Sequence, residues 1–308
     1  MTLEDAMRAA CDEAGVKPPR GLPTFGRWKR LDTLGQNGRG DASIILFDQA
    51  GGMVWNWQTA QKVPFRAGAD SVRSLSTKEL QRIKREAEAR RRRDAEEAAS
   101  AASVACRIVK SAKVETHPYL EGKGFPEEHG LVHDNPASFF PASELGVAMA
   151  RAFPKEGGPW LIVPGRIGKD VATVQFIACD GFKKNLFRGR MNGASHRIAS
   201  GRETWVCEGI ATALSVRAAL RLLGRSATIL CAFSASNAAS IAKSIPGAVL
   251  ATDHDKPVEN FGGLGTGEYY ARESGRAWAM PPERGDWNDY HQAHDLRAVA
   301  LLLREVRG

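Results

Sequence analysis

Short apolar runs alternate with amphipathic stretches of helical length through the last hundred or so residues of the chain. Apolar runs bounded by turn residues predict buried strands, and strands that alternate with helices pair in parallel through right-handed crossovers. The pattern predicts strands over 204–207, 228–232, 248–252 and 276–280, and helices over 210–223, 237–244, 265–274 and 290–306. We therefore expect an α/β domain over 201–308, built on a parallel sheet flanked by helices.

The first 75 residues follow another pattern and predict a small β-rich module (1–75). A short helix over 3–15 ends at Gly15, and residues 25–66 are rich in strand-forming side chains. Within them, the runs 44–47 and 53–57 flank a Gly-containing loop and predict a β-hairpin.

Three tryptophans of this module, Trp28, Trp55 and Trp57, allow two interpretations. On an exposed basic surface they would stack on the bases of a single-stranded nucleic acid. In a sheet this small, large aromatic side chains more often form the hydrophobic core. From the sequence alone we favour the core.

Two further segments separate this module from the α/β domain. Residues 76–112 predict a long charged helix, opened by a capping-box pattern from Ser76 to Glu79. Its arginines 90–93 would suit a phosphate backbone, but we interpret the helix as a solvated linker. Residues 113–200 predict a mixed α+β subdomain with strands over 160–164 and 172–177, followed by a basic stretch over 183–190.

The formal net charge of +8 lies entirely in the first 200 residues. Residues 201–308 contain 12 Lys and Arg against 12 Asp and Glu, which leaves 31 against 23 for residues 1–200. A basic front part favours a polyanion as partner, although the surplus alone is equally consistent with a solubility feature.

The five cysteines are scattered without a CxxC pair, which argues against both a zinc ribbon and a disulfide framework. Two of them, Cys207 and Cys231, fall on predicted buried strands. The chain shows no signal-peptide core and no apolar run that approaches 18 residues. We expect reduced thiols, no zinc, no membrane partner and a cytoplasmic location.

Carboxylates stand where three of the predicted C-terminal strands end. They are Glu208 after the first strand, Asp253 and Asp255 after the third, and Asp286 and Asp289 after the fourth. Parallel strands bring their carboxyl ends to one rim of the sheet, where ligands of α/β folds bind. Acids gathered there repel one another unless a cation joins them, and oxygen ligands favour Mg²⁺, or Mn²⁺. The sequence predicts a site for two or more such ions at this rim.

In this order and spacing, Glu208-Gly209, Asp253-x-Asp255 and Asp286-x-x-Asp289 resemble a Toprim domain. This is the metal-binding fold of bacterial-type primases, type IA and II topoisomerases and some nucleases. Upstream, the motifs His117-Pro-Tyr-Leu, Leu161-Ile-Val-Pro, Gln175-Phe-Ile and Lys183-Lys184 resemble DNA primases carried by phages, plasmids and other mobile genetic elements. The resemblance covers about residues 100–290. It departs from the replicative primases at Thr212, where those often carry another acid.

The resemblance implies a nucleotidyltransferase of DNA replication. This DNA-directed RNA polymerase would make short RNA primers from ribonucleoside triphosphates on single-stranded DNA. Glu208, Asp253 and Asp255 would be catalytic and hold metal, Asp286 would be a further ligand, and Gly209 would let the backbone approach closely. Asp289 would support the site or cap the helix predicted from Tyr290. Because the chain has no Walker A motif, a separate replicative helicase would unwind the template.

Basic residues ahead of the Toprim domain would hold the triphosphate and the template. We assign this role to Lys183, Lys184, Arg188, Arg190, Arg197 and Arg166. A solvated basic hairpin is the simpler alternative for the same residues. We expect His254, between two acids, to point away from the metal, and the glycines of 262–267 to form a lid or a turn.

Two other functions fit the acidic set. A Toprim nuclease would use the same carboxylates and metals to cut nucleic acid. A noncatalytic, single-stranded-DNA-binding accessory protein of replication would keep the Toprim fold for assembly only.

Overall fold

The computed structural model describes residues 1–35, 38, 40–48, 50–68 and 77–308, with the backbone alone at 77–80, 83, 84 and 260. Its contacts divide the chain into two units, one of residues 1–93 with 257–264 and the other of residues 94–256 with 265–308. The capping box predicted from Ser76 to Glu79 lies outside the described side chains.

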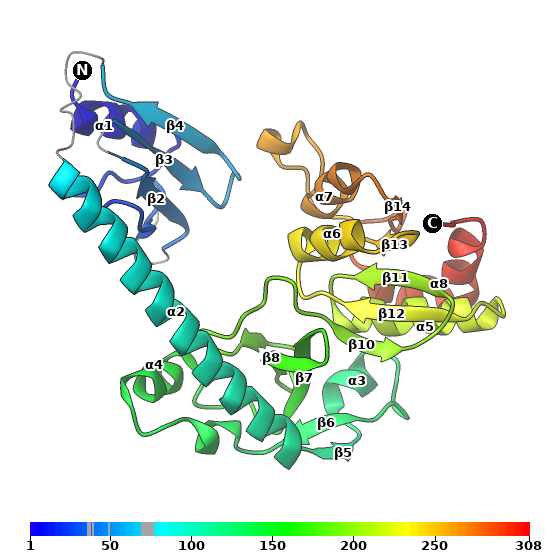
Figure 1. Cartoon of the computed structure of the whole chain (residues 1–308). Coiled ribbons are helices and arrows are strands. Elements are labelled where there is room, and N and C mark those ends of the chain that lie inside the picture. The colour runs from blue at the N-terminus through cyan, green and yellow to red at the C-terminus, as the bar shows by residue number, and fades with distance from the viewer. Residues whose placement is uncertain (36–37, 39, 49, 69–76) are drawn as a thin grey trace. The chain divides into compact units, whose positions relative to one another are not determined.

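The first unit packs one helix, α1 (Leu3–Glu13), against one face of a four-stranded antiparallel sheet (Figure 1). Thr2 caps this helix and forms a capping box with Asp5. The strands, in spatial as in sequence order, are β1 (Lys29–Leu31), β2 (Ala42–Leu46), β3 (Gly51–Asn56) and β4 (Lys62–Arg66). The predicted hairpin is confirmed, because β2 pairs antiparallel with β3. Met7 of α1 packs with Ile44 and Val54 in the core of this unit.

The three tryptophans lie on the other face of this sheet, so the core interpretation is wrong. Trp55 pairs with Ser43 and Lys62 across the strands, whereas the alternate residue Val54 belongs to the core under α1. Trp28 and Trp57 remain 43% and 37% exposed. A single helix covers only one face of a sheet, and here it covers the face that carries aliphatic side chains.

In the second unit, a five-stranded antiparallel sheet follows the long helix α2 (Thr77–Ser111), which begins in the first unit. Its strands, in spatial order, are β5 (Lys113–Glu115), β6 (Gly130–His133), β7 (Trp160–Ile167), β8 (Asp170–Ile177) and β9 (Lys183–Asn185). The end of α2 and α4 (Glu144–Ala152) cover one face of the sheet. The short helices α3 (Pro118–Gly122) and 136–139, a 3-10 helix, lie in its connections.

The end of α2 differs from the solvated linker that we expected. Ala101, Val104, Ala105 and Ile108 are fully buried against Ile162 and Phe176 of the sheet. These four positions follow the i, i+3, i+4, i+7 spacing of one helix face. The last turns of α2 are therefore part of the hydrophobic core of the second unit.

A second five-stranded sheet lies in the same unit, with strand order β10-β12-β11-β13-β14. Its strands are β10 (His196–Ala199), β11 (Glu203–Cys207), β12 (Ala227–Cys231), β13 (Ala248–Ala251) and β14 (Ala277–Ala279). The last four are parallel, as predicted, and β10 adds an antiparallel edge that we did not expect.

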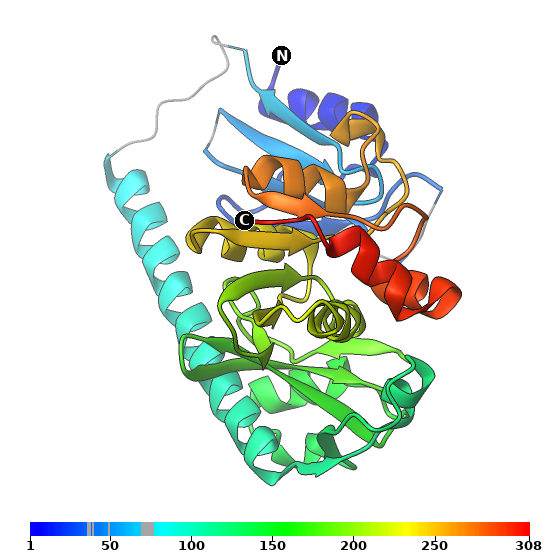
Figure 2. The same ribbon diagram turned by 90° about the vertical axis from the view of Figure 1, so that its right-hand side faces the viewer.

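Helices cover both faces of this sheet (Figures 1 and 2). Alternate strand residues divide between two cores, one with α5 (Ile210–Leu222) and α8 (Trp287–Leu303), the other with α6 (Ala235–Ser244) and α7 (Thr266–Ser274). Helix α8 is interrupted at Asp295, where φ is +76°. The predicted α/β class is confirmed, with a β-rich module and a mixed subdomain ahead of the parallel sheet.

The two sheets of the second unit share one hydrophobic core. Tyr119 and Leu120 of α3 and Ile177 of β8 pack with Trp205 and Trp287 of the parallel-sheet layer. Buried Asn237 of α6 adds a polar link. Its Oδ1 accepts a hydrogen bond from the amide of Gly193 at 2.8 Å, and its Nδ2 donates to the carbonyl oxygen of Ala194 at 2.9 Å. The loop between β9 and β10 is thereby held to α6.

All five cysteines are free thiols, and Cys207 and Cys231 are buried in strands β11 and β12, as predicted. No described helix is long and apolar enough to cross a membrane.

Candidate active site

The predicted acids stand at the switch point of the parallel sheet. From the central strand β11, the chain first crosses to β12 on one side and then returns to β13 on the other. Cys207 pairs with Ala251, so Glu208 and Asp253 follow two neighbouring strands that end at the same level. In open α/β sheets the crevice between two such strand ends is where ligands bind. The fold alone therefore brings Glu208 and Asp253 to one place.

The charges of these acids act on one another. Burial, and then the charge on Asp255, raise the pKa of Glu208 to about 7. Burial, and then the charges on Glu208, Asp286 and Asp255, raise the pKa of Asp253 to about 8. Groups at a functional site often show shifts of this size, caused by burial together with like charges. Four of the predicted acids thus form one electrostatic cluster.

Hydrogen bonds hold two of the carboxylates at the rim, whereas one buried oxygen of a third accepts none from the described residues. Thr212 Oγ1 of α5 donates to Asp253 Oδ1 at 3.4 Å, and the Gly267 amide of α7 donates to Asp255 Oδ2 at 2.9 Å. Oε1 of Glu208 is buried without a partner. An unpartnered buried oxygen is costly, so it marks a place where a ligand would be stabilised. Thr212, the residue at which the chain departs from the resemblance, therefore contacts one of the acids.

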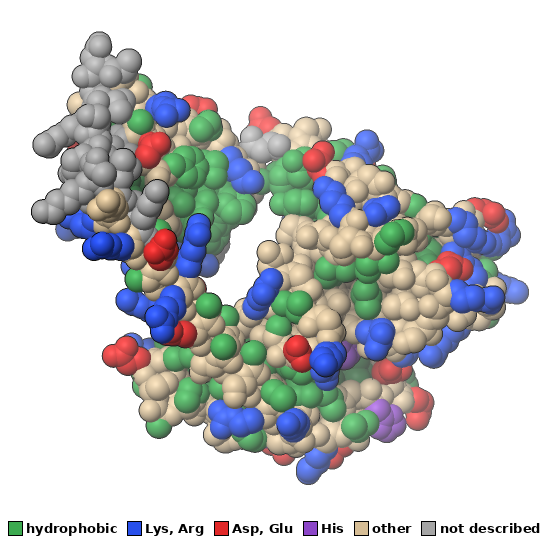
Figure 3. All heavy atoms as spheres, viewed as in Figure 1, with side chains coloured by type: hydrophobic (Ala, Val, Ile, Leu, Met, Phe, Trp, Pro, Cys, Tyr) green, Lys and Arg blue, Asp and Glu red, His purple; other side chains and the backbone are tan. Residues whose placement is uncertain are grey.

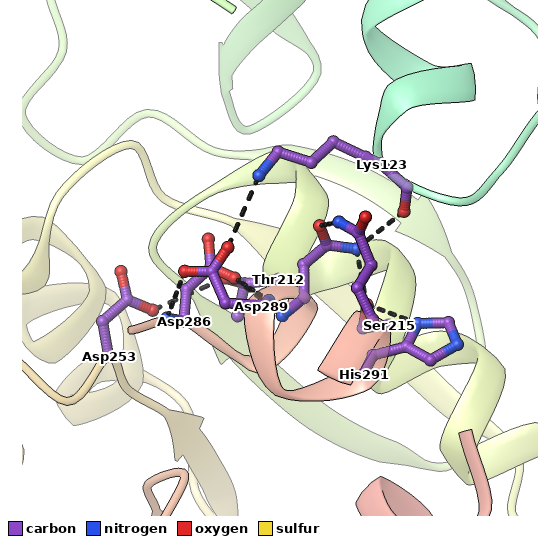
Figure 4. A network of polar contacts seen from close by, with 9 residues as sticks. Lys123, Thr212, Ser215, Asp253, Asp286, Asp289 and His291 are labelled. Carbon is purple, nitrogen blue, oxygen red and sulfur yellow. Dashed lines mark hydrogen bonds and ion pairs between the residues drawn. The ribbon is translucent and has the colours of Figure 1, made fainter. Parts of the chain in front are cut away.

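Asp286 and Asp289 begin helix α8 in a shared capping box (Figure 4). Asp286 Oδ1 accepts hydrogen bonds from the amides of Asn288 and Asp289, and Asp289 Oδ2 accepts one from the amide of Asp286. The helix therefore starts at Trp287 instead of Tyr290, and Asp286 is its cap. This leaves Asp286 Oδ2 available to a cation, whereas Asp289 also faces Lys123, whose Nζ lies 3.6 Å from its Oδ1.

Among the described residues, no three His, Cys, Asp or Glu side chains are already drawn together as a metal site. The donor set nevertheless fits a divalent cation that prefers oxygen. It offers mutually repelling carboxylates, and one of their oxygens lacks a partner. The side chain of His254 is turned away as predicted, with Nδ1 3.0 Å from the carbonyl oxygen of Pro281.

Sequence reasoning missed Gly267, which fixes the backbone beside the acids. A Cβ at this position would lie 2.4 Å from Thr252 Oγ1 and 2.5 Å from the carbonyl oxygen of Asp253. The glycines of 262–267 form a turn into α7: Gly262 is left-handed, with φ of +65°, and Gly265 is the N-cap. The close spacing of these glycines in the sequence could have drawn attention to Gly267, but it does not reveal which residues α7 packs against.

The predicted pair Lys183 and Lys184 is split by strand β9. Lys183 pairs with Ile177, on the sheet face that packs toward α3 and the parallel sheet, whereas Lys184 pairs with Phe176, on the face under α2 and α4. Lys183 Nζ lies 5.7 Å from the centre of the Tyr119 ring and 3.9 Å from where a Cβ on Gly209 would stand. Of these two lysines, Lys183 is therefore the one on the side of the acids.

The four arginines of the prediction lie in different surroundings. Arg188 pairs with Glu97 at 2.8 Å and Asp94 at 3.7 Å, so its charge is directed toward α2. Arg166 donates to the carbonyl oxygen of Lys169 at 3.1 Å, in the turn between β7 and β8. Arg190 is exposed in the loop after β9, and Arg197 is exposed on the edge strand β10. The structure does not gather these side chains around Lys183.

Tyr119 is a further side chain at the site to which we assigned no role. Burial, and then the charge on Asp286, raise its pKa, and its hydroxyl is buried without a hydrogen-bond partner. The ring thus lies between the acids of α8 and the ammonium group of Lys183. Asn288 Nδ2 donates to the carbonyl oxygen of Lys123 at 2.8 Å and holds the end of α3 beside the start of α8.

Residues 203–295 match the family model described as Toprim domain. This match covers the parallel sheet from β11 onward together with all five acids. The C-terminal part of the chain is a Toprim domain.

One solved structure with some similarity contains the lagging-strand DNA polymerase of bacteriophage T7 interacting with the primase domains of two gp4 subunits, bound to an RNA/DNA hybrid and dTTP. The alignment has 15% sequence identity and a TM-score of 0.33, and it covers 46% of this chain and 76% of the matched chain.

The acids of the Toprim domain make its stability depend on pH when no divalent cation is present. Asp253 and Glu208 bind protons more tightly in the folded protein than in the unfolded chain, so the folded protein is stabilised at low pH and loses stability as the pH rises from about 4 to about 8. We expect a loss of roughly 5 kcal/mol or more, equivalent to about 10 °C or more in melting temperature. Thermal unfolding in EDTA at several pH values measures it.

A matched variant separates this effect from general acid or alkaline denaturation. Asp253→Asn removes the charge at nearly constant shape, so its melting temperature in EDTA should exceed that of the wild type at pH 8, and the difference should disappear toward pH 4. Equal melting temperatures of the two proteins at pH 8 would contradict the mutual repulsion of the acids.

Proposed function

We propose that this protein is a DNA primase, which synthesises short RNA primers on single-stranded DNA by metal-dependent nucleotidyl transfer. The proposal rests mainly on one observation: Glu208, Asp253 and Asp255 act on one another at the switch point of a Toprim sheet, and Lys183 approaches the same point from the neighbouring sheet. The carboxylates suit positively charged metal ions, and the ammonium group of Lys183 suits the negatively charged polyphosphate.

Glu208, Asp253 and Asp255 would hold Mg²⁺ or Mn²⁺, with Asp286 Oδ2 as a further ligand. Bound divalent cations neutralise phosphate charge and favour deprotonation of the attacking 3′-hydroxyl. Thr212 would orient Asp253 through its hydroxyl, and the Gly267 amide would orient Asp255. These hydrogen bonds fix carboxylates that would otherwise turn toward water.

The triphosphate would lie between Lys183 and the N-terminus of α5. Gly209 is the N-cap of this helix and has no side chain to bond its first amides, which leaves them available to a phosphate oxygen. Its φ of −109° suits any residue, so the glycine is not required by the backbone. What it provides is open space in front of Lys183 Nζ.

In this proposal the protein works in the cytoplasm of a bacterial cell, as a primase of the type carried by phages, plasmids or other mobile elements. Its partners would be single-stranded DNA, ribonucleoside triphosphates and a separate helicase. The same acids would also serve a nuclease. The position of Lys183 opposite them, where it could bind a triphosphate, favours the polymerase.

Incubation of the full chain with labelled single-stranded DNA tests the proposal, first with Mg²⁺ alone and then with Mg²⁺ and all four ribonucleotides. We expect intact DNA in the first reaction and new RNA of a few nucleotides in the second. Shortened DNA with Mg²⁺ alone would show a nuclease. Binding to DNA without either product, under conditions in which the protein is folded, would show an accessory protein.

A further inference from the structure

The exposed face of the N-terminal sheet carries three indole rings with cations between them. We call Trp28, Trp55, Trp57, Arg30 and Lys62 the tryptophan face. The ring centres of Trp28 and Trp55 lie 6.1 Å apart, and those of Trp55 and Trp57 lie 6.0 Å apart. Arg30 Cζ lies 4.4 Å from the centre of the Trp57 ring, and Lys62 Nζ lies 4.7 Å from that of Trp55. Figure 3 shows hydrophobic side chains beside basic ones on the visible side of this module.

The fold of the module does not require this arrangement. Its core is complete on the other face of the sheet, between α1 and residues such as Ile44, Val54 and Val63. Exposed tryptophans gathered on one face form an apolar patch of the kind that marks a binding surface. Within the described part of the chain, neither Arg30 nor Lys62 forms an ion pair with a carboxylate. Arg30 Nη1 donates to the carbonyl oxygen of Gly40 at 3.2 Å, which orients its guanidinium group without neutralising the charge.

Charges are sorted between the two sides of the module. Four of the seven acids within residues 1–68, namely Glu4, Asp5, Asp12 and Glu13, belong to α1, behind the sheet. In β4 the residues alternate between exposed and buried, which places Arg66 on the same face as Lys62. The tryptophan face therefore presents aromatic rings and positive charge together, with the acids of α1 on the opposite side.

We propose that the tryptophan face binds single-stranded DNA. Unpaired bases would stack on the exposed rings of Trp28 and Trp57, and Arg30, Lys62 and Arg66 would contact the phosphates. Stacked, paired bases hide their faces, so duplex DNA offers this surface only its phosphates. This site lies in the first unit and uses none of the acids of the Toprim domain, so it holds whether or not the chain synthesises primers.

Binding of labelled oligo(dT) to the full chain in EDTA, without ribonucleotides, tests this site. We expect Trp57→Leu to weaken binding about tenfold, and Trp57→Phe to weaken it much less because a stacking ring remains. Leu22→Ala, which removes a similarly exposed apolar side chain of the same module, should change nothing. Joint substitution of Arg30 and Lys62 by Gln should reduce the slope of log Kd against log salt concentration by about 1.4, because two phosphate contacts are lost.

A second measurement does not depend on substitutions. Oligo(dT) containing 5-iododeoxyuridine, crosslinked by light, should form adducts at Trp28 or Trp57, located by mass spectrometry. Adducts confined to the second unit would overturn the proposal, as would equal affinity for duplex DNA or unchanged affinity of Trp57→Leu. An oligo(rU) probe that binds more tightly than oligo(dT) would replace DNA by RNA as the ligand and also overturn it.

Discussion

Asp253→Asn is expected to lower the proposed primer synthesis by at least roughly a thousandfold, because the loss of one carboxylate from the proposed metal site would remove several kcal/mol of transition-state stabilisation. Asp253 lies at the centre of the cluster, where the charges of Glu208, Asp255 and Asp286 all act on it. Glu208→Gln should have an effect of the same size, because its Oε1 has no partner within the described protein. Primer yield on single-stranded DNA at saturating ribonucleotide measures both.

The controls separate chemistry from folding and from template binding. Glu273→Gln changes an exposed acid of α7 in the same domain and should retain full activity. Asp253→Asn should still bind oligo(dT) with the affinity of the wild type and melt at no lower temperature. Full primer synthesis by either acid variant would refute the assigned roles, whatever the result at the tryptophan face.

Lys183→Gln is expected to raise the KM for ribonucleotides by about 10- to 100-fold, whereas Lys184→Gln should stay within about twofold of the wild type. The two residues are adjacent, carry the same charge and differ in the side of β9 on which they lie. Lys183 faces Tyr119 and the space in front of Gly209, whereas Lys184 faces the core under α4. Steady-state kinetics with varied ribonucleotide measures the difference.

This pair is its own control, because both substitutions remove one positive charge from the same strand. A general contribution of net charge would weaken both variants equally, and the salt dependence of DNA binding would then fall in both. Equal kinetic effects at the two positions would therefore contradict the separation of the two lysines and restore the interpretation as a solvated basic hairpin.

The parallel sheet was predictable because its signals are local and agree with one another. Each buried strand is a continuous apolar run, and each helix has its own boundary residue. Glu208 directly follows β11, and Asp253 stands two residues after the end of β13. Since neighbouring parallel strands end at one rim, the closeness of these two acids follows from the order of the elements. The Toprim resemblance added the roles of these residues, which remain proposals.

The faces of the short strands were not predictable in the same way. Strand β9 has three residues, so no periodicity shows which of its two lysines points toward the acids. That choice depends on its register with β8, which is a long-range property. The prediction that the tryptophans form the core was wrong for a related reason. Both faces of β3 carry large or apolar residues, and only the position of α1 decides which of them becomes the core.

Other features follow from contacts between segments far apart in the chain. Asn237 holds the loop around Gly193, and Gly267 leaves room for the backbone of Asp253; neither is part of a motif. Arg188 belonged to a basic stretch, but its charge is directed toward Glu97 of α2. The apolar stripe of α2, from Ala101 to Ile108, was present in the sequence and concealed by the charged residues before it.

That stripe determines where the chain can be cut without exposing the core of the second unit. A fragment that starts at Lys113, the first strand residue of the second unit, would lack the α2 side chains that cover Ile162 and Phe176. It would therefore expose a hydrophobic surface on the antiparallel sheet. We therefore expect a stable fragment that contains the acids to begin near Asp94, so that the second half of α2 stays with it.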